Sequence, residues 1–376
     1  MQSESRSQAQ QTVEELLALA DVKVNGSRPW DITVHNQSLY RRLLASGTMG
    51  LGEAYMDGWW DAKQPDQLIQ RLLSADLRNQ VKLSPSLVKQ AVLSTMLNRQ
   101  TTKRAKHNAS FHYNIGNDLY ERMLDKRMIY SCAYWKDAKN LDDAQEAKLD
   151  LICKKLYLKK GMTLLDIGCG WGGFAEYAAR KYGVKVTGIS PAAEQVKLAK
   201  QRTKGLPVKI LQQDYRDVKG HFDRIVSIGM LEHVGPKNYK TFFDKCHSLL
   251  NEGGMMLHHT IGSNRSLHSN EPWIDKYIFR GAVLPSIAQI SSAVENKLII
   301  EDVHNFGPYY DKTLLAWQAN FAKHYPEIAD NYDERFYRMW NYYLYSCAGA
   351  FRARHIQLWQ FVMRKIEPTQ PYIGVR

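Results

Sequence analysis

Hydrophobic residues recur along the chain with two spacings, and from about residue 160 the two spacings alternate. Short apolar runs predict β-strands, and apolar residues at every third or fourth position predict helices. The predicted strands are residues 162–168, 184–190, 208–214, 222–230 and 253–262. The helices predicted between them are residues 172–183, 192–204 and 237–250. Strands separated by helices of this length predict an α/β fold with a doubly wound, mostly parallel sheet.

The two ends of the chain differ from this middle part. Residues 1–110 are predicted to form a small, mostly helical N-terminal domain, and residues 111–376 a larger second domain. After about residue 265 the chain is more helical and richer in aromatic residues. Residues 334–365 are predicted to form one or two long helices.

Charge changes this picture by indicating a partner. The 376 residues include 51 Lys and Arg against 38 Asp and Glu, a formal net charge of +13. Such an excess indicates an anionic partner, either nucleic acid or an anionic membrane. The segment from Leu77 to Asn117 has no acidic residue, and a helix predicted at residues 84–100 either docks on the main domain or lies on a membrane. Basic residues of this segment include Lys82, Lys89, Arg99, Lys103, Arg104 and Lys106.

Cysteine usage and the N-terminus predict a cytoplasmic protein. The five cysteines are odd in number and form no CxxC pair, which argues against a disulfide framework and against a metal site. The first residues lack a basic stretch followed by an apolar one, so a secretion signal is not expected. No apolar run approaches the ~20 residues that cross a bilayer.

The strongest chemical signal is the stretch LDIGCGWGG, which follows the first predicted strand. Gly168, Gly170 and Gly172 permit backbone conformations closed to other residues and a close approach to a ligand. Asp166 stands two residues before the first glycine, where it can accept hydrogen bonds from a cationic amino-acid group. The pattern D-x-G-x-G resembles the first motif of class I S-adenosylmethionine methyltransferases rather than a nicotinamide fingerprint. The alternative is a tight strand-to-helix turn without a ligand.

Residues after the next two strands complete the predicted cofactor site. Most such enzymes hold the ribose hydroxyls with an acidic residue after the second strand, whereas this chain offers the neutral Ser190 and Gln195. After the third strand, Asp214 is expected to take the adenine amino group and Tyr215 to stack on the ring. Arg216 follows them and is included in the predicted site.

Two nucleic-acid activities are excluded by missing motifs. Amino-group DNA methyltransferases use a Pro-Pro dipeptide after the fourth strand, and this chain contains none. Cytosine-C5 enzymes need a Pro-Cys nucleophile, and no proline here is followed by cysteine. No nucleic-acid partner is therefore expected, and methylation of a small molecule stays open.

The whole set of motifs, from Leu51 to about Gln360, closely resembles the cyclopropane-fatty-acyl-phospholipid synthases, relatives of the mycolic acid cyclopropane synthases. The stretches LGEAYMDGWW and WIDKYIF resemble the phospholipid branch in particular. The motifs that carry the resemblance are HYNIGNDLYERML, YSCAYW, LDIGCGWGG, IVSIGMLEHVGPKNY, LHHTIGS, HNFGPYYDKTLLAW and CAGAFRARHIQLWQ.

The resemblance implies a seven-stranded methyltransferase sheet and a specific reaction. Family members add the methylene carbon of S-adenosylmethionine across the cis double bond of an unsaturated phospholipid acyl chain in an anionic membrane. A carbocation forms and is deprotonated by bound bicarbonate, so aromatic faces and a dry pocket are expected around it. The resemblance further implies a homodimer at the inner face of the membrane, held there peripherally.

By the same resemblance, the bicarbonate site comprises Glu232, His259, Tyr310 and the backbone around Cys132 and Ile261. Each side chain has another reading from the sequence alone: a helix cap for the glutamate, a buried histidine, and a core tyrosine.

The resemblance also assigns cofactor contacts to Tyr130 and Ser131, the neighbours of Cys132. Cys132 itself is interpreted as a pocket wall, because no basic residue of its hexapeptide lowers its pKa. Cys347 lies on an apolar helical stripe where the family has a reactive cysteine, so it is either a wall residue or a chemical group. The family's His-Tyr-Asp appears here with Asn114, and either residue caps a helix.

Two other functions stay open. A related lipid methyltransferase would leave a methyl branch, because ring closure and reduction start from the same cation. A lipid-binding protein without activity would keep the aromatic pocket but need neither Asp166 nor Glu232.

Overall fold

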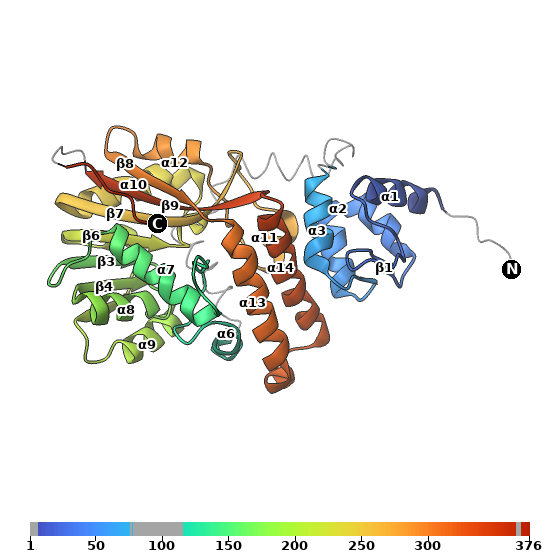
Figure 1. Ribbon diagram of the computed structural model, residues 1–376, viewed down its shortest axis with the longest axis horizontal. Helices are drawn as coiled ribbons and strands as arrows, with labels where there is room; N and C mark the ends of the chain where they lie inside the picture. Colours follow the sequence, from blue (N-terminus) through green and yellow to red (C-terminus); the bar gives the residue numbers. More distant parts are fainter. Residues whose placement is uncertain (1–6, 76, 78–115, 366–369) are drawn as a thin grey trace.

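The structure is a computed structural model that describes residues 7–75, 77, 116–365 and 370–376. Three groups of elements follow one another along its longest axis (Figure 1). The β-sheet and the helices beside it occupy one end, the antiparallel helices α13 (Pro308–His324) and α14 (Glu334–Arg352) the middle, and the N-terminal helices the other end. The predicted helix at residues 84–100, the six basic residues and Asn114 lie outside the described residues.

The sheet confirms the predicted fold class. Its seven strands stand in the order β5-β4-β3-β6-β7-β9-β8, and all pairs from β5 to β7 are parallel while β9 runs antiparallel to both neighbours. The strands are β3 (Thr163–Ile167), β4 (Lys185–Ser190), β5 (Val208–Gln212), β6 (Phe222–Ile228), β7 (Leu250–Ser263), β8 (Leu298–Asn305) and β9 (Ile356–Lys365).

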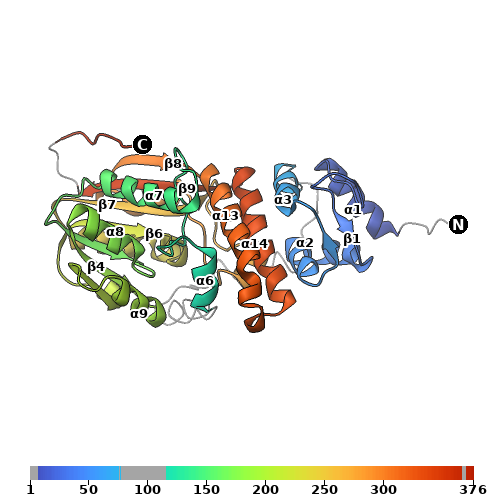
Figure 2. The ribbon, with the colours of Figure 1, turned by 60° about the horizontal axis from the view of Figure 1, so that its bottom comes forward.

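Helices lie on both faces of this sheet, with α7 and α8 together on one side (Figure 2). They are α7 (Leu141–Lys155), α8 (Gly173–Tyr182), α9 (Ala193–Arg202), α10 (Tyr239–Leu249) and α12 (Ile287–Val294). Strands β4 and β5 lie on one side of β3, and the chain then crosses over so that β6 and β7 lie on the other side. The switch point is therefore between β3 and β6, and open α/β sheets bind ligands at such a point.

The prediction of helix for residues 334–365 is wrong in its second half. Helix α14 ends at Arg352, and residues 356–365 form strand β9. Because β9 lies between β7 and β8, most of its residues are buried, so the sequence shows a continuous apolar run instead of an alternation. Periodicity alone does not separate such a strand from a buried helix.

Helix α14 also connects the sheet region to the N-terminal elements. It packs on α13 and on α2 (Ser38–Met56) and α3 (Pro65–Ser74). Gly349 makes this contact close, because a Cβ there would lie 2.5 Å from the carbonyl oxygen of Asp66. Arg352 then pairs with Asp66 of α3 and Asp311 of α13, each at 2.7 Å.

The remaining α-helices and strands belong to the N-terminal part or lie beside the middle helices α13 and α14 (Figure 1). They are α1 (Gln8–Leu19), β1 (Thr33–Val34), β2 (Trp60–Asp61), α6 (Asn117–Met123) and α11 (Pro272–Tyr277). Helix α11 packs on α2, where Gly52 leaves room for Trp273. In the described part of the chain, no helix is both long and apolar enough to cross a bilayer. The predicted domain boundary near residue 110 falls among residues that the structure does not describe and stays a prediction.

Candidate active site

A cavity of about 1440 Å³ begins at the carboxyl ends of the parallel strands and continues between α14, α11 and the N-terminal helices. Its lining includes Asp166 and Gly168 at the sheet, Tyr310 and Cys347 in the middle, and Leu72 of α3. Ligand pockets of about 300–1,000 Å³ are usual for one small molecule. The cavity is therefore large enough for more than a nucleoside cofactor.

The glycine turn forms one end of the cavity between β3 and α8. Gly168, Gly170 and Gly172 have φ of 84°, 51° and 80°, in the left-handed region that side chains disfavour. Asp166 is buried at the end of β3, and its Oδ2 has no hydrogen-bond partner among the described residues. Burial raises the pKa of this carboxyl to about 7, against the opposing effect of Lys148. Such a carboxylate suits a cationic ligand group that replaces its lost hydration.

The neutral pair after β4 lies together as its sequence positions suggest. The hydroxyl of Ser190 donates to Oε1 of Gln195 at 3.0 Å, and both side chains are buried at the cavity. Both keep further hydrogen-bonding capacity, which two ribose hydroxyls require.

The segment after β5 is more constrained than the sequence suggested. Both carboxylate oxygens of Asp214 accept hydrogen bonds from Arg216 at 2.8 Å, and Tyr215 packs edge-on against Phe242 with ring centroids 5.2 Å apart. All three line the cavity. The expected stacking of Tyr215 on adenine stays a prediction, since its ring is held in the core.

The segment 130–132 contributes Tyr130 and Ser131 to the lining of the cavity. The hydroxyls of Tyr130 and Tyr343 are 2.8 Å apart, and Oγ of Ser131 accepts a hydrogen bond from Nζ of Lys148 at 2.7 Å. Cys132 is fully buried, its thiol donates to the carbonyl of Ala133 at 3.3 Å, and burial raises its pKa. The thiol is therefore neutral, but Cys132 does not line the cavity, so its interpretation as a pocket wall stays a prediction.

The residues predicted to bind bicarbonate come together from separate elements. The backbone N–H of Ile261 on β7 donates to Oε1 of Glu232 at 2.7 Å, while the buried Oε2 of Glu232 has no partner within the described residues. Burial raises the pKa of Glu232 to about 7. His259, two residues before Ile261, has Nδ1 at 3.2 Å from Nε2 of Gln360, and its Nε2 has no partner in the described structure. Burial lowers the pKa of His259 well below its usual value, so its ring is neutral.

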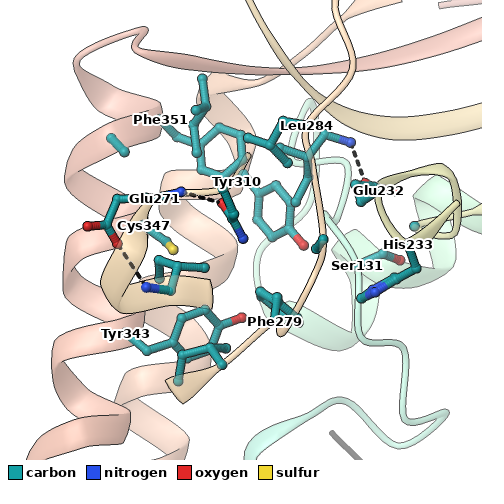
Figure 3. A pocket seen from close by; sticks show the side chains of 18 of the residues that line it. Ser131, Glu232, His233, Glu271, Phe279, Leu284, Tyr310, Tyr343, Cys347 and Phe351 are labelled. Atoms are coloured by element: carbon teal, nitrogen blue, oxygen red, sulfur yellow. Dashed lines mark hydrogen bonds between the residues drawn. The ribbon is translucent and has the colours of Figure 1, made fainter. Parts of the chain in front are cut away.

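Tyr310 completes this group from α13. Its ring stacks on Phe351 of α14 with centroids 4.5 Å apart. Its pKa is raised by burial and by the neighbouring Cys132, Glu232 and Cys347, which places its phenol among them. Figure 3 shows Tyr310 between Phe351 and Cys347 on one side and Glu232 on the other. Burial also raises the pKa of Cys347 to about 12, so this cysteine forms part of an uncharged wall.

Two cavity residues, Lys148 and His233, and the neighbouring Gln145 were missed by the sequence analysis. Gln145 and Lys148 are fully buried on α7, and Lys148 lines the cavity. Their signal was available, because both occupy positions that an amphipathic helix at 141–155 gives to apolar residues. His233 also lines the cavity, near Phe279, and burial lowers its pKa to about 4. It had been noted only as the neighbour of Glu232.

Comparison with known proteins agrees with this geometry. Residues 100–361 match the family model of mycolic acid cyclopropane synthetase. The chain is 52% identical over 351 residues to the cyclopropane-fatty-acyl-phospholipid synthase of Escherichia coli K12, covering 93% of this chain and 92% of the relative. It is 36% identical over 355 residues to a probable fatty acid methyltransferase of Pseudomonas putida, covering 89% and 86%.

A solved structure shares the fold of the sheet region. The crystal structure of mycolic acid cyclopropane synthase CmaA1 complexed with SAH and CTAB superposes with a TM-score of 0.65 and 34% sequence identity, covering 69% of this chain and 98% of that chain. The family model and the relatives span most of the sequence and include the glycine turn and the Glu232 segment. The chain thus belongs to the mycolic acid cyclopropane synthetase family of S-adenosylmethionine-dependent methyltransferases.

Proposed function

We propose that the protein transfers the methylene carbon of S-adenosylmethionine to the cis double bond of an unsaturated phospholipid acyl chain and forms a cyclopropane ring. The observation that carries the proposal is the single cavity that joins the buried Asp166 of the glycine turn to an apolar passage. S-adenosylmethionine is the methyl donor in this reaction, and the lipid is the acceptor.

The sheet end of the cavity fits the donor. Oδ2 of Asp166 would accept a hydrogen bond from the ammonium of the methionine part, which supplies the partner that this buried oxygen lacks among the described residues. Ser190 and Gln195 would hold the ribose. Asp214 would accept from the adenine amino group beside its pair with Arg216, because a carboxylate has about four acceptor sites.

The middle of the cavity fits the acceptor chemistry. Methyl transfer to one alkene carbon leaves a cation on the other, and loss of a proton from the added carbon allows the ring to close. The aromatic faces of Tyr310, Phe351 and Phe279 line this region and would stabilise a cation. Burial keeps the phenol of Tyr310 neutral. The same apolar wall excludes water, which would otherwise capture the cation.

The group around Glu232 fits a small oxyanion. Oε2 of Glu232 and Nε2 of His259 are buried and lack partners in the described structure, and Ile261 supplies the backbone beside them. Bound bicarbonate, which the resemblance implies, would supply the base that takes the proton. Glu232 and His259 would hold it in place by hydrogen bonds, with Tyr310 at its edge.

The far end of the cavity fits an acyl chain. It is lined there by the N-terminal residues Leu43, Leu51, Ile69 and Leu72, and by Leu44, whose side chain is exposed. A hydrocarbon chain buried here would gain about 0.8 kcal/mol per methylene group. The basic residues between Leu77 and Asn117 would bring the protein to an anionic membrane surface, each contributing about 1 kcal/mol near it. Peripheral binding at the inner face and a homodimer are likewise proposed from the resemblance.

A methyl-branching activity is the second candidate. The probable fatty acid methyltransferase of Pseudomonas putida is 36% identical to this chain, so related sequences carry a name of that class. Both reactions use the same cation, and the product alone separates them.

The release of S-adenosylhomocysteine tests the proposal. Protein and S-adenosylmethionine are incubated with vesicles of a monounsaturated phosphatidylglycerol or of its fully saturated analogue. Release is expected only with the unsaturated lipid. Equal release from both vesicles, or none from either, would contradict an alkene acceptor.

A further inference from the structure

Helix α7 presents two buried polar side chains to residues 129–131, which line the cavity. Nε2 of Gln145 donates to the carbonyls of Ser131 at 2.9 Å and Ile129 at 3.3 Å. Nζ of Lys148, one turn further along the helix, donates to Oγ of Ser131 at 2.7 Å. Both α7 side chains are fully buried, so this arrangement fixes the backbone and the hydroxyl of Ser131 together.

The hydrogen bond from Lys148 determines what the Ser131 hydroxyl is able to do. An ammonium only donates, so Oγ of Ser131 must accept, and its single proton has to point elsewhere. Oγ of Ser131 donates no hydrogen bond within the described residues, and the residue lines the cavity together with Lys148 and Asp166. Figure 3 shows Ser131 on the side of the cavity where Glu232 and His233 lie. The hydroxyl is therefore available to donate to a ligand.

The charge of Lys148 indicates the kind of ligand. The ionisable groups near it are Asp125, Asp166, Cys132 and His259. No carboxylate of the described residues lies within 4.0 Å of Nζ, and Asp125 is already hydrogen-bonded to the backbone of Arg127 and Ile129 at 3.0 and 2.8 Å. A buried cation with one neutral partner favours an anionic group nearby.

We propose that Lys148 is a positioning residue that directs the hydroxyl of Ser131, and its own positive charge, toward the carboxylate of the methionine part of the donor. This inference rests on the proposed function. It assigns opposite ends of the donor's amino-acid group to two elements: Asp166 of β3 takes the ammonium, and Ser131 with Lys148 of α7 takes the carboxylate. The arrangement selects for a ligand that carries both charges.

Two ligands that differ only in this amino-acid group provide the test. S-adenosylhomocysteine carries the carboxylate, and 5′-methylthioadenosine lacks the amino-acid part. Calorimetric titration of Lys148→Met should show at least about tenfold weaker binding of S-adenosylhomocysteine, because a charge-assisted interaction is lost. Binding of 5′-methylthioadenosine should stay within about twofold of the parent, since no contact to it changes.

Further variants separate positioning from a structural role. Ser131→Ala should weaken S-adenosylhomocysteine binding, and adding Lys148→Met to it should cost clearly less than Lys148→Met costs in the parent, because Lys148 acts in part through that hydroxyl. Lys148→Arg should keep the preference for S-adenosylhomocysteine. Lys155→Met is the matched control: Lys155 is also fully buried on α7 but faces His304 at 3.0 Å and does not line the cavity. It should leave both affinities unchanged.

The inference is overturned if Lys148→Met weakens both ligands equally, weakens neither, or adds its full effect to Ser131→Ala. If Lys148→Met does not fold, loss of the preference in Lys148→Arg would overturn it instead. If the parent binds S-adenosylhomocysteine but the variants give one of these overturning results, only the role of Lys148 is contradicted. A parent that binds neither ligand contradicts the proposed donor site as well.

Discussion

Burial sets the protonation of the single residues around the cavity. It raises the pKa values of Asp166 and Glu232 to about 7 and lowers those of His233 and His259. At neutral pH the histidines are uncharged, and the two carboxyls are near their midpoints. Small changes of pH or of a bound partner therefore change the charge of this site.

Glu232→Gln should reduce turnover by about a hundredfold while leaving S-adenosylhomocysteine affinity intact, because it disturbs the binding of the base rather than of the donor. Parent turnover should fall as the pH drops below about 7, where the carboxylate takes up a proton. The variant should lack this dependence. Initial rates between pH 6 and 9 measure both effects, and parent-like turnover in the variant would remove Glu232 from the chemistry.

The same residue predicts a gain in stability. Its pKa is higher in the folded protein, about 7 against 4.5, so the folded state binds the extra proton and its stability is lost as pH rises through this range. Glu232→Gln should therefore be more stable than the parent at pH 8, by up to about 3 kcal/mol, and similar to it at pH 4.5. Urea unfolding at the two pH values measures the difference. An equal stability at pH 8 would contradict the burial of a charge at this position.

Gly168→Val should abolish S-adenosylhomocysteine binding. A Cβ at this position would lie 3.3 Å from Cγ of Met230, and the φ of 84° is unfavourable for any side chain. Gly220→Val is the control for backbone strain, because its φ is 101°, a Cβ there meets nothing within 4 Å, and it does not line the cavity. Calorimetric titration of both variants should show loss only for Gly168→Val. An unchanged affinity would remove the glycine turn from the donor site.

Among the helices and strands, the sequence predicted those elements whose pattern lies within their own short segment. The strands β3 to β7 and the glycine turn follow from apolar runs and glycine spacing within short segments. Strand β9 was missed because the sheet buries both of its faces, a fact about its neighbours rather than its own residues. Lys148 was missed for a related reason, since a lysine on the apolar side of a helix gains meaning only from the Ser131 hydroxyl opposite it.

The close contact between α14 and α3 predicts whether Gly349→Ala raises or lowers the stability of the protein. Glycine to alanine inside an exposed helix usually stabilises a protein by up to about 1 kcal/mol. Gly349→Ala should instead destabilise it by about 1–3 kcal/mol, because the added Cβ meets the backbone oxygen of Asp66 at 2.5 Å. Urea unfolding of the variant and the parent measures the change in the free energy of unfolding. The affinity for S-adenosylhomocysteine is expected to be unchanged. A stabilised variant would contradict the close contact between these helices.

At the scale of the whole molecule, the cavity connects parts that are far apart in the sequence. Val13 of α1 and Arg354 near the C-terminal end line the same space. No periodicity or spacing predicts such a cavity, and the grouping of Glu232, His259 and Tyr310 was expected only from the resemblance to a family. The N-terminal elements thus contribute walls to the cavity.

Leu72→Trp should obstruct the acyl end of the cavity from α3 and reduce lipid turnover at least about tenfold. The affinity for S-adenosylhomocysteine should not change, since the proposed donor site is at the sheet. Leu19→Trp is the control, because Leu19 is 54% exposed on α1 and does not line the cavity. If both variants turned over lipid like the parent, the acyl chain would lie elsewhere.

The central claim is that one cavity combines a methyl donor with a lipid alkene to make a ring. Mass spectrometry of phospholipids, after incubation of monounsaturated vesicles with the protein and S-adenosylmethionine, tests it most directly. The account predicts acyl chains that gain one CH2 and resist ozonolysis, because the double bond has become a cyclopropane. A methyl-branched product, which gains CH2 and two further hydrogens when the cation is reduced, or lipid that is unchanged, would contradict it.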